Sequence, residues 1–197
     1  MYIYLTFLIT FYCMSGICFL YDYLDKQNVK YNDKMLQYKN IYNLVLINSF
    51  IYIPLISLPY EYLLISKLEF NLNYSIKRII IGLLLLDFFF YICHRIMHIS
   101  YIYRWSHKLH HKYRDSVSIE ALYLHWFDLY FGNILPLYIC VCTADLYTNI
   151  IWTIIIMTST VLSHSNIIKS QHNDHHKHFV YNYGLGVYMD RLLETEF

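Results

Sequence analysis

The sequence predicts an all-α fold, a multi-pass bundle of about four or five transmembrane helices with a histidine-rich cap. Three observations predict this class. Of the 197 residues, 57% are hydrophobic and only 15% are charged, whereas soluble domains carry about 25% charged residues. Several uncharged runs approach the roughly 20 residues that a helix needs to span a bilayer. Nine of the 11 histidines then follow these runs in groups with repeated spacing.

Two uncharged runs open the chain. Met1–Tyr21 predicts a first span that is retained, because it lacks the basic start and the small-residue cleavage site of a signal peptide. Asp22–Lys39 carries four lysines and is expected to be a polar connector. The second run, Asn40–Tyr60, contains Pro54 and Pro59, which favour a kinked or re-entrant helix.

Three more spans are expected in the rest of the chain. After a short polar turn at Lys67–Arg78, Ile79–Cys93 predicts the third span. Ile119–Thr143 predicts the fourth span, and Ile150–Leu162 predicts a shorter fifth. The C-terminal part, Lys169–Phe197, is polar with a few apolar anchors.

The 197 residues are long enough for one domain and hardly for two. We therefore expect a single integral-membrane domain, with N-terminal spans in residues 1–84 and the histidine-rich region in residues 85–197. The 15 basic and 14 acidic residues nearly balance. Nucleic acid is therefore not an expected partner, since its binding needs a positive field.

Basic residues are distributed unequally between the connectors. Asp22–Lys39, Arg95–Ser118 and the C-terminal tail together hold twelve Lys and Arg, against three in Lys67–Arg78. An odd number of spans places the three richer segments on one face, which the positive-inside rule makes cytosolic. All histidine groups would then face the cytosol. The basic residues of Arg95–Ser118 themselves fit either an interfacial belt or a docking surface for an electron donor.

The histidines recur at helical spacing. Asp87, His94 and His98 stand at i, i+7 and i+11, which is one face of a helix. The pattern His-x-x-His-His occurs twice further on and can direct two imidazoles the same way from one turn. The nine candidate ligands are His94, His98, His107, His110, His111, His164, His172, His175 and His176.

Nine histidines exceed the three or four ligands of a single zinc centre. They suit two metal ions with four or five imidazoles each. The chain has no Glu-x-x-His and no His-Glu-x-x-His sequence, so the ligand set would be almost entirely nitrogen. A basic patch for anionic headgroups is the alternative, but such a patch needs cations, whereas these histidines are ordinarily neutral.

Four other residues are candidates for a part in the metal site. His125 could be a ligand or could support one. Asp87, Asp128 and Asp190 could add a ligand, or could accept hydrogen bonds from the far ring nitrogens of ligand histidines and so fix their tautomer. His178 is expected to be exposed and not to bind metal. Neutral imidazoles favour iron, copper or zinc over magnesium or calcium.

At these residues the chain resembles the fatty acid hydroxylase/sterol desaturase superfamily, over about residues 85–197. Stretches further along resemble the sterol branch, closest to the carbon-4 methyl sterol oxidases: Glu120 to His125, Gly132-Asn133-x-Leu135-Pro136 and His164-Ser165. The superfamily motifs are His94-Arg95-x-x-His98, His107-x-x-His110-His111, His172-x-x-His175-His176, Asn182-Tyr183-Gly184 and Asp190-Arg191-Leu192.

Three stretches depart from the sterol branch. His125-Trp126-Phe127-Asp128 stands where that branch has His-Pro-x-Glu, and Glu194-Thr195 stands where it has Gly-Thr. The interval from His164 to His172 is also shorter. These departures concern the choice of substrate more than the chemistry.

The resemblance implies a membrane enzyme of the endoplasmic reticulum with two iron ions. It implies hydroxylation or oxidation of a lipid C–H bond with dioxygen, in sterol biosynthesis, since no acid or base can take such a hydrogen and a redox metal must. Electrons would come from NAD(P)H through a separate donor, a cytochrome b5-type protein and its reductase. A fatty acyl hydroxylase and a sterol desaturase are alternatives within the superfamily. A membrane metal-binding or transport protein without oxidative turnover is the alternative of another class.

Overall fold

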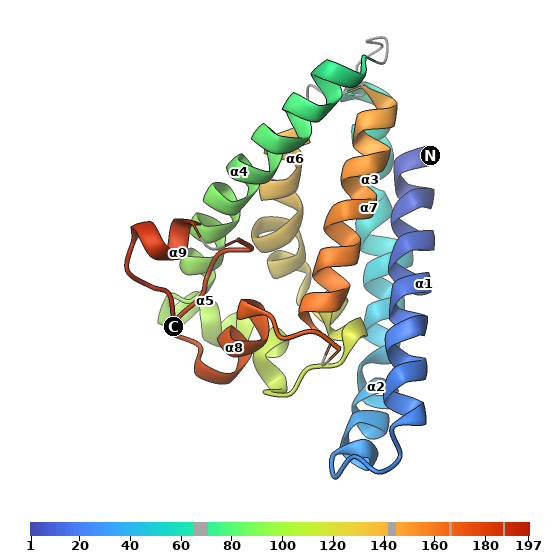
Figure 1. Cartoon of the computed structure of the whole chain (residues 1–197), viewed down its shortest axis with the longest axis vertical. Helices are drawn as coiled ribbons and strands as arrows, with labels where there is room; N and C mark the ends of the chain where they lie inside the picture. The colour runs from blue at the N-terminus through green and yellow to red at the C-terminus, as the bar shows by residue number, and fades with distance from the viewer. Residues whose placement is uncertain (65–70, 142–144, 166, 187) are drawn as a thin grey trace.

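The computed structural model describes residues 1–64, 71–141, 145–165, 167–186 and 188–197. Over these residues the protein is all-helical, as predicted (Figure 1). The elements are α1 (Tyr2–Leu24), α2 (Tyr31–Ile47), a π-helical segment (Asn48–Tyr52), α3 (Ile53–Leu64), α4 (Leu72–Met97), α5 (Ser100–Trp105), two 3-10 helices (His107–Lys112 and Ser118–Leu122), a second π-helical segment (Asp128–Ile134), α6 (Leu135–Val141), α7 (Leu146–Ser163), α8 (Gln171–His178) and α9 (Tyr188–Leu192).

Four helices are long and apolar enough to cross a membrane among the described residues. They are Tyr2–Leu24, Tyr31–Tyr62, Leu72–Met97 and Leu146–Ser163. They lie where the first, second, third and fifth spans are predicted, and together with the clustered histidines they confirm the predicted fold class. The second is one continuous helix of 32 residues with a π-helical segment inside it, and it continues past Pro54 and Pro59.

The predicted fourth span at Ile119–Thr143 is wrong as one helix. Its first part is a short 3-10 helix followed by irregular chain up to residue 125, and helix resumes only at residues 126–141. Ile119, Leu122 and Leu124 are buried in the protein core rather than exposed to lipid. Hydropathy cannot separate these two environments, because both select apolar residues.

The connector expected at Asp22–Lys39 is also mostly helix. The loop is confined to residues 25–30, because α1 extends to Leu24 and α2 begins at Tyr31. The polar residues here pack between helices: Lys34 pairs with the Asp22 carboxylate, which also accepts a hydrogen bond of 3.0 Å from the Tyr38 hydroxyl. The predicted turn at Lys67–Arg78 shrinks as well, since α4 begins at Leu72, and residues 67–70 lie outside the described residues.

Each π-helical segment ends two residues before a proline. Pro54 is the second residue of α3 and Pro136 is the second residue of α6. A proline inside a helix lacks the N–H donor and clashes with the carbonyl four residues earlier. A widened turn relieves that clash at the cost of one irregular turn, so these two helices continue past their prolines.

The helices form a bundle that holds its histidine-rich cap at one end (Figure 1). α1 runs along α7, and α4 leans away from α7 toward the end where α5, α8 and α9 gather. At the opposite end α4 and α7 come close, because Gly82 has no side chain: a Cβ there would stand 3.0 Å from Nε1 of Trp152. α4 and α7 diverge toward the histidine-rich end, so side chains of other helices lie between them there.

Candidate metal centre

Short helices at one end of the bundle bring the nine predicted histidines together. α4 supplies His94 and is followed by its C-cap His98, the 3-10 helix His107–Lys112 supplies three histidines, α7 is followed by its C-cap His164, and α8 supplies three more. The N-cap of α8 is Ser170, whose hydroxyl accepts a hydrogen bond of 3.1 Å from the backbone N–H of Asn173, a normal N-terminal cap. All nine side chains are buried except that of His98, which is partly exposed.

The nine histidines form two groups, each of which could hold a metal ion. The first contains five residues and the second contains four, and within each group one ligand nitrogen from each residue lies within 4.8 Å of all the others. The five-histidine group is His94, His98, His107, His111 and His175, and the four-histidine group is His110, His164, His172 and His176. This division matches the prediction of four or five imidazoles per ion.

In the five-histidine group the Nε2 atoms face one another. The Nε2 of His94 lies 3.1 Å from that of His107, which lies 3.0 Å from that of His111. The Nε2 of His175 lies 3.2 Å from that of His111 and 3.0 Å from that of His98. All five rings therefore direct the same nitrogen to one point.

The four-histidine group has the same arrangement. The Nε2 of His164 lies 3.4 Å from that of His110 and 3.1 Å from that of His172. The Nε2 of His176 lies 3.2 Å from that of His172. Ligands at about 2.1 Å from an ion stand roughly 3.0 to 3.4 Å apart in octahedral or tetrahedral geometry, so the spacing in both groups fits a bound transition metal.

Partners on the far side of the rings show which nitrogen carries the hydrogen. The Nδ1 of His94 donates to the Tyr183 carbonyl at 2.7 Å, because a carbonyl can only accept. The Nδ1 of His107 lies 2.7 Å from the Asp128 carboxylate, which accepts its hydrogen. The Nε2 atoms of both rings are buried and lie 3.1 Å apart. A cation between the rings would bind a lone pair from each of these two nitrogens.

Burial keeps the histidines of the cap in the neutral, metal-binding form. Burial lowers the pKa of His164 to about 4, and it lowers that of His175 to about 3, each against a hydrogen bond to a backbone carbonyl that raises it. A metal ligand must be deprotonated, so these groups are ready to bind at neutral pH. Burial is also the main cause that lowers the pKa values of five other histidines, and neighbouring histidines lower them further. These are His98, His110, His111, His172 and His176.

Asp128 lies where the sequence predicts a supporting carboxylate, whereas Asp87 and Asp190 have other partners. The Asp87 carboxylate accepts from the backbone N–H groups of Gly186 at 2.5 Å and Met189 at 3.2 Å. Asp190 accepts from the N–H groups of Tyr183 and Gly184, at 2.8 and 2.7 Å. Within the described residues, neither is hydrogen-bonded to a ring nitrogen. Both fix the C-terminal loop, and that loop supplies the Tyr183 carbonyl to His94.

His125 and His178 lie outside both groups. The His125 ring packs edge-on against Trp105, with 5.0 Å between ring centroids, and its Nδ1 accepts a hydrogen bond of 3.4 Å from the N–H of Phe127. His178 is exposed and stacks on Phe197 at 4.3 Å. A role for His125 as a ligand or as the support of one stays a prediction.

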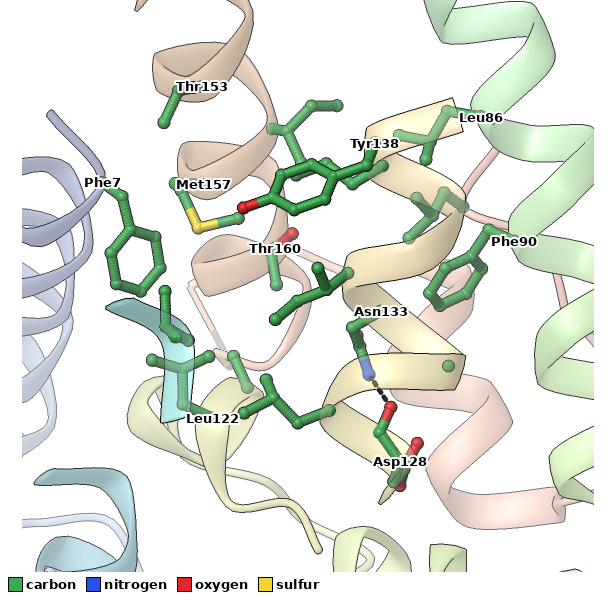
Figure 2. Close-up of a pocket in the computed structure, with 18 of the residues that line it drawn as sticks. Phe7, Leu86, Phe90, Leu122, Asp128, Asn133, Tyr138, Thr153, Met157 and Thr160 are labelled. Carbon is green, nitrogen blue, oxygen red and sulfur yellow. Dashed lines mark hydrogen bonds between the residues drawn. The ribbon is translucent and has the colours of Figure 1, made fainter. Parts of the chain in front are cut away.

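An apolar cavity opens next to the histidines and extends between the helices (Figure 2). His94, His107, His110, His164 and His172 form its polar end. Figure 2 shows Phe7 of α1, Phe90 of α4, Tyr138 of α6 and Met157 of α7 around it, together with Leu122 of the 3-10 helix Ser118–Leu122. Its far wall reaches Thr153, eleven residues before His164, which is roughly 16 Å along a helix.

Sequence reasoning missed the backbone atoms that orient the rings. The carbonyls of Tyr183, Tyr181 and Thr160 accept from His94, His175 and His164 at 2.7, 2.5 and 2.8 Å. Every residue has a backbone carbonyl, so the residue type does not indicate which carbonyls orient the histidine rings. The motif Asn182-Tyr183-Gly184 was the one available signal, because it marked the loop without indicating what the loop does.

The fold and the two histidine groups define a helical membrane protein whose cap could hold two metal ions at the end of an apolar cavity. The chain belongs to the fatty acid hydroxylase family, whose sequence model matches residues 79–195. The match includes all nine clustered histidines.

Several characterised proteins are similar to the chain. It is 30% identical over 139 residues to a Delta(7)-sterol 5(6)-desaturase of Schizosaccharomyces pombe, covering 64% of this chain and 45% of that protein. It is 29% identical over 141 residues to a methylsterol monooxygenase of Aspergillus fumigatus, covering 61% and 48%. It is 28% identical over 182 residues to a fatty acid hydroxylase of Mycosarcoma maydis, covering 82% and 46%.

The chain thus spans about half the length of these relatives. No solved structure shows a significant match to it.

Proposed function

We propose that the protein is an iron- and dioxygen-dependent oxidoreductase that oxidises a C–H bond of a membrane lipid. One observation carries this proposal: the buried Nε2 atoms of His94 and His107 face each other at 3.1 Å, on the wall of an apolar cavity. That arrangement calls for a cation beside a space that suits an apolar molecule. Membership of the fatty acid hydroxylase family supports the same conclusion.

The nine clustered histidines would hold two iron ions. Iron with dioxygen supplies the oxidising power that side-chain acids and bases lack. The residues of the chain have three tasks around it. Asp128 and the carbonyls of Tyr183, Tyr181 and Thr160 hold the ring hydrogens on Nδ1, so that each Nε2 stays free to bind. The cavity walls exclude water and place an apolar chain against the histidines.

We infer that the substrate is a sterol and that the reaction is of the methylsterol monooxygenase type. Two of the similar proteins are by name a sterol desaturase and a methylsterol monooxygenase. The apolar cavity runs roughly 16 Å into the bundle, a depth suited to a long apolar molecule. A sterol desaturase and a fatty acyl hydroxylase are the alternatives, and the likeness to a fatty acid hydroxylase over 82% of this chain favours the second of these.

Electrons would come from NAD(P)H through a cytochrome b5-type donor and its reductase. The surface around the histidine cap carries exposed cations: Arg95, Arg104, Lys108 and Lys112. An acidic donor would be attracted to such a surface. We place this face in the cytosol, and the protein in the endoplasmic reticulum membrane, because the basic connectors lie on this side.

The test combines metal content with lipid analysis. The purified protein should contain about two irons per chain, and cells that express it should accumulate oxidised 4-methyl sterols. His110→Ala should abolish that product, because it removes one of the clustered nitrogens. His178→Ala is the matched control: this histidine is exposed and lies outside both groups, so product should be unchanged.

Two results would replace the proposal with an alternative. A changed pool of 2-hydroxy acyl chains, with sterols unaffected, would identify a fatty acyl hydroxylase. Full iron loading without any dioxygen-dependent product, in membranes supplied with an electron donor, would favour a metal-binding or transport protein. A transporter, however, should place its ionisable groups near mid-membrane, whereas these histidines gather at one end of the bundle.

A further inference from the structure

We propose that the two histidine groups are inequivalent metal sites. The five-histidine group binds its ion tightly, and the four-histidine group binds more weakly and keeps a coordination position open toward the cavity. The proposal rests on the proposed function in one respect, namely that both groups bind metal.

The five-histidine group is largely oriented before any ion arrives. Three of its rings donate from Nδ1 to a fixed acceptor: His94 to the Tyr183 carbonyl, His107 to Asp128 and His175 to the Tyr181 carbonyl. Asp128 also places a carboxylate behind a ligand ring, which makes that ligand a better donor to a cation. His98 is partly exposed, so its far nitrogen can reach solvent.

The four-histidine group has far less support. Only His164 has an acceptor for its Nδ1, the Thr160 carbonyl at 2.8 Å. The Nδ1 atoms of His110, His172 and His176 are buried and have no hydrogen-bond partner in the described part of the chain. When Nε2 binds an ion, the hydrogen must sit on Nδ1, and a buried N–H without an acceptor is destabilising. The five-histidine group has one such atom, the Nδ1 of His111, against three in this group. Ligation here therefore carries a penalty that the other group mostly avoids.

The position of the cavity adds a second distinction. Three of the four residues in this group, His110, His164 and His172, line the apolar cavity, against two of the five in the other group. Six-coordinate ions would keep two positions free among four imidazoles, but only one among five. Reactive metal sites keep open positions next to the substrate space, and the four-histidine group has more of them than the five-histidine group.

Removing the hydrogen-bond partner of a metal-binding histidine typically lowers metal affinity 10- to 100-fold. Because the four-histidine group lacks three such partners, we expect its affinity to be at least about 10-fold lower. The first equivalent of metal should then fill the five-histidine group.

Cobalt tests this without any need for turnover. The full chain, purified in detergent and freed of metal by a chelator, is titrated anaerobically with Co²⁺. Bound ions are counted after equilibrium dialysis, and the visible absorption of bound Co²⁺ is recorded. Two steps with affinities at least about 10-fold apart are expected. Two ions that bind with equal affinity would overturn the proposal.

His175 and His176 provide a matched pair of variants. They are neighbours on α8, both fully buried, and they belong to different groups. His175→Ala should weaken the tight step and leave the weak one, and His176→Ala should do the reverse. An exchange of these effects, or the loss of both steps in each variant while helicity by circular dichroism is retained, would contradict the assignment.

Asp128→Asn keeps the shape of the side chain and gives a third test. It should lower the affinity of the tight step 10- to 100-fold and leave the weak step unchanged. A change confined to the weak step would overturn the proposal. If the unsubstituted protein binds no Co²⁺ at all, both this proposal and the proposed function fail, whereas equal affinities at two sites end only the inequivalence.

Discussion

Asp87 and Asp190 act on the candidate metal centre indirectly, because they hold the C-terminal loop that contacts His94. Their carboxylates accept hydrogen bonds from four backbone N–H groups of residues 183–189. That loop presents the Tyr183 carbonyl to His94. The two carboxylates approach because Gly184 lies between them without a side chain: a Cβ there would stand 2.6 Å from Asp87 Oδ1 and 2.9 Å from Asp190 Oδ2.

Gly184→Ala should therefore displace the loop and loosen His94. We expect a loss of about 1–3 kcal/mol, as for other overpacked positions, seen as a lower melting temperature and reduced iron retention. Gly16→Ala is the matched control, because a Cβ at Gly16 meets nothing within 4 Å. It lies inside α1 and should gain up to about 1 kcal/mol from helix propensity. Equal effects of both substitutions would contradict this account of the loop.

Glu120 is a buried acid outside the spanning helices. It is fully buried, and burial raises its pKa to about 9, while its Oε2 accepts a hydrogen bond of 2.8 Å from Gln37. Its ordinary pKa is 4.5. Between these two values the folded protein keeps a proton that the unfolded chain releases. The free energy of unfolding therefore falls as pH rises through this window, by at most about 1.4 kcal/mol per pH unit.

Glu120→Gln should remove this pH dependence. Glutamine keeps the oxygen that Gln37 needs and carries no charge at any pH. We expect the variant to match the unsubstituted protein near pH 5 and to be more stable at pH 8, measured by thermal unfolding in detergent. The difference between the two proteins is the quantity to follow, because other groups titrate equally in both. A difference that does not grow with pH would show that Glu120 is charged in the folded state.

At the scale of the helices, the sequence predicted what hydropathy and spacing can encode. The spans now seen as α1, α4 and α7 were recognisable, because each is apolar over most of its length. The grouping of the histidines was recognisable too, because His-x-x-His-His fits one turn. Irregular chain at 123–125, where Tyr123 and Leu124 are buried, could not be told from a lipid-facing helix, since burial in protein and burial in lipid select the same residues.

Hydrogen-bond partners were harder to predict than positions. Three acidic residues near the histidines looked equivalent in sequence, yet Asp128 binds a ring and the other two bind backbone N–H groups. The hydrogen-bond partner of each carboxylate depends on which loop lies beside it, and the tertiary fold sets that.

The π-helical segment between α2 and α3 ties the second span to the histidine region. Asn48, its first residue, donates from Nδ2 to the carbonyls of Leu122 and Leu124, at 2.8 and 2.9 Å. These carbonyls lie at the end of the 3-10 helix and in the irregular chain after it. They need a donor, because they are buried. π-helical segments are often found where a helix meets a functional site, and this one faces the chain that lines the cavity.

Asn48→Leu should leave those two carbonyls without a donor. The expected loss is about 1–3 kcal/mol for each buried carbonyl left unpaired, visible as a lower melting temperature and as weaker metal retention. Asn40→Leu is the matched control on the same helix, where the side chain is exposed, and its effect should stay within about 0.5 kcal/mol. Similar losses in both would mean that the leucine itself, and not the lost hydrogen bonds, destabilises the helix.

At the scale of the whole molecule, the first loop and the histidine cap lie at the same end of the bundle. Lys30, in the loop between α1 and α2, pairs with Asp115 of the histidine region at 2.5 Å. The two basic segments, Asp22–Lys39 and Arg95–Ser118, therefore lie at the same end of the bundle even though the predicted fourth span is not one helix. Both carry many lysines and arginines, so the charge rule assigns a single face to the connectors and the histidines together.

This orientation predicts which positions a reagent can reach. In a cysteine-free background, Lys177→Cys on α8 should react with a membrane-impermeant maleimide in sealed vesicles whose cytosolic face is outward. Tyr74→Cys, on the first turn of α4 at the opposite end of the bundle, is the matched control, since both positions are exposed. It should react only after the vesicles are made permeable. Labelling in the reverse order would place the histidines in the lumen, out of reach of a cytosolic electron donor, and would require the donor to be sought on the other side of the membrane.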